Sequence, residues 1–293
     1  MKKTSEIPQQ QPLSVIKSTR RNLISVLIGS IIVANSFIVL SSGENRVFFS
    51  NWTINITAAI ALGSALIIVY RQKLDGLYGK AFASLAVGLA LWFIAEIVWT
   101  YFELGLHIDF PFPSIADLFW LIGYSFLAYH LYRIYNFVRI GTIKPAVVII
   151  VSVATAIILG FTVYLIISIS ELSNTQNQDP DDMGLLLVSI AYPILDGILL
   201  VPAVLVLWTA RAGQLANTHW MLLALSLLII VTADSGFAYI AVLDVNSLQR
   251  GSWLWDMFYN AGYLLIAAAL FWHNKFFISN EKEIMKKWQE QNR

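Results

Sequence analysis

Carboxylic acids stand inside stretches of this chain that are otherwise apolar enough to dissolve in lipid. Five such positions are present, namely Glu96, Asp117, Asp196, Asp234 and Asp256. An ionised acid at the centre of a bilayer costs about 2.5–3.5 kcal/mol on insertion scales. Acids at this depth therefore indicate a ligand site, a proton or cation site, or hydrogen bonds that hold helices together.

Two of these acids begin the same short motif, D-x-F-[WY]-x-x-G-Y. One copy runs from Asp117 to Tyr124 and the other from Asp256 to Tyr263. A further acid precedes each copy by one helix and a turn, Glu96 in the first case and Asp234 in the second. We interpret this as an internal repeat of two halves in parallel orientation, and parallel repeats often hold their shared site between the halves.

Aromatic side chains accompany the acids at helical spacing. Residues three, four or seven positions apart share one face of a helix, so the acids should be backed by ring edges and phenol hydroxyls. The same stripe that holds Glu96 also carries Glu103. The candidate ligand-binding residues are Glu96, Asp234, Asp196, Asp117, Asp256, Trp92, Trp99, Trp120, Tyr124, Tyr192, Tyr259 and Tyr263.

Structural interpretations compete with a ligand site. The pattern Ser114-x-x-Asp117 is typical of an N-terminal helix cap, and Asp256 is also expected within the first turn or so of its helix. Glu96 and Asp234 lie too deep to be caps, as does Asp196, but all three could be neutral acids bonded to Tyr or Ser between helices. If Glu96 and Asp234 face each other, their repulsion would suit a cation, a cationic ligand or a shared proton.

Composition places the chain in a membrane. Of its 293 residues 58% are hydrophobic and 13% charged, with a mean hydropathy of +0.68, whereas soluble domains are about 25% charged. Cysteine is absent, which excludes disulfides and thiolate chemistry. The four histidines are dispersed along the chain, no predicted span contains a lysine for a Schiff base, and no catalytic or phosphate-binding motif occurs. We expect no cofactor, no bound metal and no nucleic acid.

The expected fold is an all-α integral membrane protein with eight transmembrane helices. Each predicted span is long enough to cross about 30 Å of hydrocarbon. In this arrangement all basic residues except Arg46 and Arg250 fall on one side, which predicts that both termini are cytoplasmic. The predicted spans are Leu23–Leu40, Ile54–Tyr70, Ala81–Tyr101, Ile115–Tyr135, Pro145–Ile169, Met183–Ala210, Trp220–Leu243 and Trp253–Trp272.

Three parts follow from this topology. Residues 1–22 form a cytoplasmic N-terminal segment, residues 23–273 form the membrane domain, and residues 274–293 form a cytoplasmic helical tail. The repeat halves run from about 23 to 140 and from 145 to 273.

The acids and their neighbours also carry a resemblance to a known kind of module. It rests on Trp92, Glu96, Trp99, Pro113-Ser114-x-Ala116-Asp117, Tyr192-Pro193-x-x-Asp196, Asp234 and Asp256. The chain resembles the multi-pass sensory domains found N-terminal to diguanylate cyclase (GGDEF) or histidine kinase outputs in bacteria and archaea. The resemblance implies sensing at or outside the membrane. Because the chain stops about twenty residues after the last span, such a copy would signal through a partner.

We therefore expect a sensor or ligand-binding module of the cell membrane. Its acidic and aromatic pocket would face outward, and its tail would contact a signalling partner. A transporter or ion-pathway subunit, a structural subunit of a membrane complex, and an enzyme are the alternatives. The inner half of each span lacks acids, which argues against transport because a relay needs polar groups along its whole path.

Overall fold

The computed structural model describes residues 13–74, 76–108, 112–138, 181–210, 218–243 and 245–276, together with single positions between 149 and 167. Within these residues the regular elements are helices, and no strand occurs among them. Most of the predicted N-terminal segment, most of the predicted fifth span Pro145–Ile169 and nearly all of the tail lie outside the described residues.

The helices have the following bounds: α1 Leu13–Val39, α2 Glu44–Gln72, α3 Gly76–Thr100, the π-helical turn η1 Tyr101–Gly105, α4 Ile115–Val138, α6 Asp181–Ala210, α7 Thr218–Leu243 and α8 Val245–Phe276. Three helices begin well before the predicted spans: α1 at Leu13, α2 at Glu44 and α8 about two turns before Trp253. The reason is that polar residues at a membrane surface can extend a helix without being apolar enough to extend a span.

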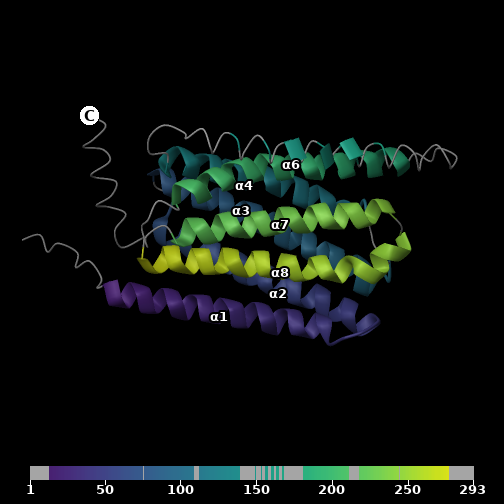
Figure 1. Ribbon diagram of the computed structural model, residues 1–293, viewed down its shortest axis with the longest axis horizontal. Coiled ribbons are helices and arrows are strands. Elements are labelled where there is room, and N and C mark those ends of the chain that lie inside the picture. The colour runs from purple at the N-terminus through teal and green to yellow at the C-terminus, as the bar shows by residue number, and fades with distance from the viewer. Residues whose placement is uncertain are drawn as a thin grey trace, which may run out of the picture.

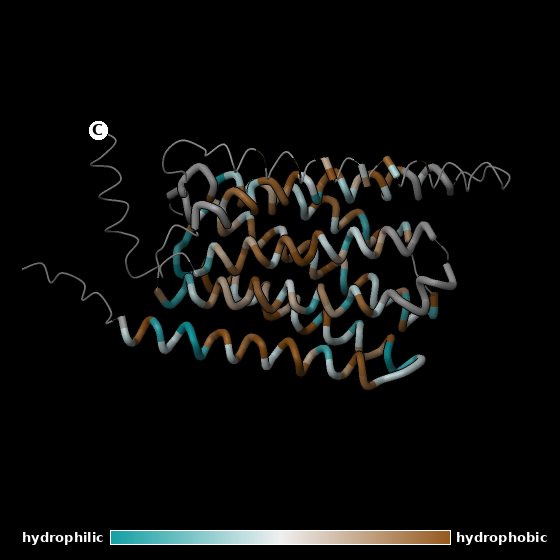
Figure 2. The backbone as a smooth tube through the Cα atoms, in the orientation of Figure 1, coloured by the Kyte–Doolittle hydropathy of each residue, from teal (hydrophilic) through white to brown (hydrophobic). Residues whose placement is uncertain are grey.

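Six of the described helices are long and apolar enough to cross a membrane, which indicates a multi-pass membrane protein. They are α1, α2, α3, α6, α7 and α8. The helix α4 is not among the six, because Asp117, His130 and several tyrosines lower its hydropathy. In α1 the hydrophilic positions gather in the first turns and hydrophobic ones follow (Figure 2).

Local sequence explains how these helices start, end and continue. Gly43 lies in the left-handed region with φ of 57° immediately before α2, a conformation that glycine adopts without a steric penalty. Glu44 in the first turn of α2 and Arg71 in its last turn complement the helix dipole. The helix α6 continues through Pro193 and Pro202, as membrane helices often do.

The bundle consists of two packed groups of three helices (Figure 1). In one group α3 packs between α2 and α4, and in the other α7 packs between α6 and α8. The groups meet where α8 packs on α2 and where α6 packs on α4, while α1 covers the outside of α8 and α2.

An apolar core fills the middle of the bundle. Alanines on one face of α2 (Ala58, Ala61 and Ala65) are buried and allow neighbouring helices to approach closely. Large side chains from α3, α4, α7 and α8 complete this core, including Leu89, Leu127, Leu227 and Ile266.

Candidate functional site

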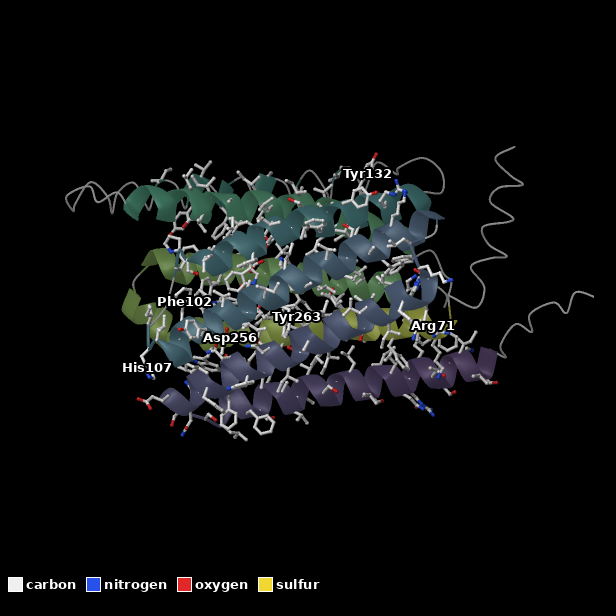
Figure 3. The ribbon with its side chains drawn as sticks, turned by 180° about the vertical axis from the view of Figure 1, so that it is seen from behind. Arg71, Phe102, His107, Tyr132, Asp256 and Tyr263 are labelled. Carbon is white, nitrogen blue, oxygen red and sulfur yellow. The ribbon has the colours of Figure 1, made fainter. Side chains whose placement is uncertain are left out.

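A cavity of about 210 Å³ opens at one end of the bundle. Its wall reaches Gly43 and Arg46 at the start of α2 and Phe112 just before α4. Figure 3 shows Asp256 towards the end that carries Phe102 and His107, with Arg71 and Tyr132 at the opposite end. Eleven of the twelve candidate residues line this cavity, namely Glu96, Asp234, Asp117, Asp256, Trp92, Trp99, Trp120, Tyr124, Tyr192, Tyr259 and Tyr263.

The helix α3 and the turn η1 that continues it present one stripe of side chains to the cavity. Trp92, Glu96, Trp99 and Glu103 all line it, which confirms that these residues share one face. Glu96 is only 8% exposed, and its Oε1 accepts a hydrogen bond of 2.8 Å from the hydroxyl of Tyr263. The indole N–H of Trp92 donates to the carbonyl of Trp120 at 3.1 Å, which ties α3 to α4.

Two acids share the hydroxyl of Tyr124. The oxygen of this phenol lies 2.7 Å from Asp196 Oδ1 and 2.7 Å from Asp234 Oδ2. A phenol has one hydrogen to donate, so the second of these hydrogen bonds has to be donated by a carboxylic O–H. Both contacts are therefore hydrogen bonds only when the pair Asp196–Asp234 carries a proton. Tyr259 adds a hydrogen bond of 2.5 Å to Asp234 Oδ1.

Asp196 is the one candidate residue that does not line the cavity. It is 2% exposed and its carboxyl group bonds the phenol of Tyr124. The hydroxyl of Tyr124, which lines the cavity, thus links Asp196 to the cavity wall.

Asp117 caps the N-terminus of α4 and also lines the cavity. Its Oδ2 accepts the backbone N–H of Ser114 at 2.6 Å, and Ser114 Oγ accepts the N–H of Ala116 at 3.2 Å. The predicted N-terminal cap is thus confirmed. The other carboxylate oxygen, Oδ1, accepts the hydroxyl of Tyr192 at 2.8 Å, so this acid also joins α4 to α6.

The cap interpretation was wrong for Asp256. Because α8 begins at Val245, Asp256 lies about three turns inside the helix and not in its first turn. The polar residues before Trp253 read as a loop in the sequence, but they continue the helix. Asp256 accepts a hydrogen bond from the hydroxyl of Ser50 on α2.

The two motif tyrosines donate to acids of the opposite helix group. Tyr124, which ends the first motif, donates to acids of α6 and α7, whereas Tyr263, which ends the second motif, donates to Glu96 of α3. Glu96 and Asp234 line the same cavity, but each is bonded to phenols and not to the other acid.

Several wall residues were not among the candidates. Ser50 and Asn51 of α2 belong to a polar run that resembles an N-glycosylation pattern, yet Asn51 is buried and donates to Glu103 Oε2 at 2.7 Å. Polar side chains inside an apolar segment were the signal that would have indicated their place in the site. The others are Gly43, Arg46, Val47, Ile54, Glu103, Phe112, Ser189, Ile230, Phe237, Ala238 and Trp253.

Three of the histidines, although dispersed in the sequence, are gathered at the other end of the bundle. The rings of His219 and His273 are 5.0 Å apart between centroids, and Phe82 packs against His273 at 4.4 Å and against His130 at 5.3 Å. All three histidines are buried. In the part of the chain that the structure describes, no group of three His, Asp or Glu side chains has a geometry that could hold a metal ion.

No family model, curated protein or solved structure matches this chain. What the protein does therefore has to be inferred from the cavity and the helices around it.

Proposed function

We propose that this protein is a ligand-binding module of a multi-pass membrane sensor, with its cavity facing away from the cytoplasm. The observation that carries the proposal is the convergence of acids and aromatic rings from α3, α4, α6, α7 and α8 on a single open cavity. A polar cavity inside an apolar bundle is costly, and polar residues at membrane depth commonly mark a functional site. The resemblance to bacterial and archaeal sensory domains agrees with this function, and the tail would contact the signalling partner.

The inner end of the cavity, towards the middle of the bundle, is lined by apolar core residues. This feature supports ligand binding more than transport. About two turns below Glu96 and Asp234 on the same helices lie Leu89 and Leu227, and both belong to the buried apolar core. Leu127 and Ile266 lie one turn beyond Tyr124 and Tyr263 and join the same core. A ligand entering the cavity meets a closed apolar floor and not a continuous polar path.

The contacts of the motif glycines support the proposed repeat. A Cβ atom on Gly123 would lie 2.5 Å from Trp92 Cδ1, and one on Gly262 would lie 2.5 Å from Ile230 Cγ1. Trp92 stands four residues before Glu96, and Ile230 stands four residues before Asp234. Each motif glycine thus meets the residue one turn before the acid on the preceding helix, so the α3–α4 pair and the α7–α8 pair are built alike.

The relative direction of α4 and α6 supports eight spans. The bonds Tyr192–Asp117 and Asp196–Tyr124 run in the same order along both helices, which means that α4 and α6 are parallel. A span between them would account for the return of the chain. The predicted span Pro145–Ile169 supplies it in our proposal; most of that segment lies outside the described residues.

The proposed orientation predicts which positions an impermeant reagent reaches. Because the natural chain has no cysteine, Ser42→Cys and Leu74→Cys would each introduce a single thiol at an exposed position on either side of α2. We expect a membrane-impermeant maleimide to label Ser42→Cys on intact cells and Leu74→Cys only after permeabilisation. The reverse pattern would contradict cytoplasmic termini, and labelling of both positions on intact cells would contradict a span at α2.

The binding function predicts that a small molecule accompanies the purified protein. We expect native mass spectrometry of protein taken in mild detergent from its own membranes to show a bound species, which denaturation releases. The control is Ala238→Trp, which would fill the cavity from its wall and should remove that species while leaving the thermal unfolding temperature close to that of the natural chain. Identical spectra without bound mass for both proteins would contradict the proposal.

A further inference from the structure

We propose that the ligand of this cavity is a small organic cation, an ammonium group that carries short alkyl substituents. This inference rests on the proposed binding function and specifies its ligand class. It follows from three properties of the cavity, namely the charge of its wall, the continuity of its aromatic rings and its volume.

The wall carries a large excess of acidic groups. Five of its side chains are acids and one, Arg46, is basic. Arg46 does not neutralise them, because its Nε donates to the carbonyl of Ser41 and its guanidinium lies over the ring of Trp253. A wall of this composition attracts a positively charged ligand and repels an anion.

The acids are hydrogen-bonded but not paired with cations. Glu96 and Asp117 are 8% and 2% exposed, and the donors to both are phenol hydroxyls or backbone N–H groups. Among the described residues no basic side chain forms an ion pair with either acid. A bound cation would supply a counter-charge to these acids when they are ionised.

Aromatic rings form a continuous belt around the same space. Trp99 contacts Trp120 at 5.7 Å and Phe237 at 6.0 Å between centroids, and Phe237 contacts Phe112 at 6.3 Å. On the deeper side Trp92 contacts Tyr124 at 5.3 Å. Tryptophan, tyrosine and phenylalanine rings bind alkylammonium groups through cation–π attraction, and cages of such rings hold quaternary ammonium ligands.

The guanidinium of Arg46 already packs against one aromatic ring of this wall. The guanidinium carbon of Arg46 lies 4.6 Å from the centroid of Trp253, within the range of about 6 Å for a cation–π contact. This pair is independent of the acids and shows that the mouth of the cavity accommodates a planar cation against an indole.

The volume limits the size of the ligand. At about 210 Å³ the cavity is smaller than the 300–1,000 Å³ of pockets for drug-sized ligands. It corresponds to the liquid volume of about seven water molecules. Small ammonium compounds fit this space, whereas a peptide or a lipid does not.

The test compares three probes that have the same shape and different charge. They are choline, its neutral carbon analogue 3,3-dimethyl-1-butanol, and the anionic analogue 3,3-dimethylbutanoate. We expect choline to quench or shift the tryptophan fluorescence of the protein in proteoliposomes at millimolar concentration. The two analogues should bind at least about tenfold more weakly, since a difference of 1.4 kcal/mol corresponds to one such factor.

Two variants test whether choline binds in the cavity. Glu96→Gln keeps an acceptor for Tyr263 and should weaken choline binding about tenfold or more, while Glu44→Gln, an exposed acid at the same end, should leave it unchanged. Unchanged choline affinity in a folded Glu96→Gln protein would overturn the inference. If Glu96→Gln fails to fold, Trp99→Leu against Trp99→Phe provides the same comparison, with loss expected only for leucine.

The outcomes separate the ligand class from the proposed function. Equal binding of choline and its neutral analogue, or no binding of choline beside a co-purified neutral molecule, would overturn the cation and leave the binding module intact. If native mass spectrometry detects no bound molecule and fluorescence detects no binding of choline, both the cationic ligand and the binding module are overturned. Accumulation of labelled choline inside the vesicles, abolished by Glu96→Gln, would support the cation and replace sensing with transport.

Discussion

Replacing Tyr124 with phenylalanine is expected to cost about 2–4 kcal/mol in free energy of unfolding. The lost hydroxyl bridges Asp196 and Asp234, at 2.7 Å from an oxygen of each. Without it, two carboxyl groups face each other in an apolar bundle and each loses a hydrogen-bond partner. Leaving buried polar or charged groups without partners carries penalties of this size. Titration with a denaturing detergent, followed by the loss of helix signal, measures the effect.

The pH dependence of the stability of the Tyr124→Phe variant distinguishes a hydrogen-bonded bridge from simple packing. At high pH both carboxyl groups of the variant would be ionised and would repel each other, so the destabilisation should be largest there. At low pH a carboxylic O–H of one acid can donate to the other directly, and part of the loss should be recovered. Tyr132→Phe is the matched control, because Tyr132 is exposed on the same helix at 62%. Equal stability of the two variants would contradict a bridging role.

Substituting alanine for either motif glycine should destabilise the protein by about 1–3 kcal/mol, which is the usual range for overpacking. The added methyl group at Gly123 would lie 2.5 Å from Trp92, and the one at Gly262 would lie 2.5 Å from Ile230. Both approaches are too close for a carbon–carbon contact, so the side chain of Trp92 or Ile230, or the helix that carries it, would have to shift. The same detergent titration measures these changes.

The control for the glycine substitutions is Gly63→Ala on α2. No heavy atom lies within 4 Å of the position of its Cβ, and alanine is about 1 kcal/mol better than glycine inside a helix. We expect this variant to be unchanged or slightly more stable. A Gly123→Ala protein as stable as Gly63→Ala would mean that the helices tolerate separation at the motif and that the two pairs are not closely packed there.

Much of this protein was predictable from its residues. Long apolar segments predict membrane helices because backbone groups in lipid have to be satisfied within the chain, and six of these helices meet that criterion of length and composition. Helical spacing placed Trp92, Glu96 and Trp99 on one face, and all three line the cavity. Eight spans, cytoplasmic termini and sensing remain predictions.

The local sequence misled at specific points. It predicted that Asp256 lies in the first turn of its helix, but α8 begins at Val245. It gave no indication that His130, His219 and His273 lie together, because they belong to three helices far apart in the sequence.

Periodicity within a helix is a local property, and the sequence by itself therefore determined which side chains share a face and which segments are apolar. Which faces meet depends on the packing of helices against one another, and only the tertiary structure decided it. That packing set Tyr124 between Asp196 and Asp234, set Tyr263 against Glu96, and left Asp196 out of the wall of the cavity. These hydrogen bonds join residues 72 to 167 positions apart and leave no periodic trace in a single sequence. The bridge at Tyr124 and the cavity around it therefore became visible only once the helices were assembled.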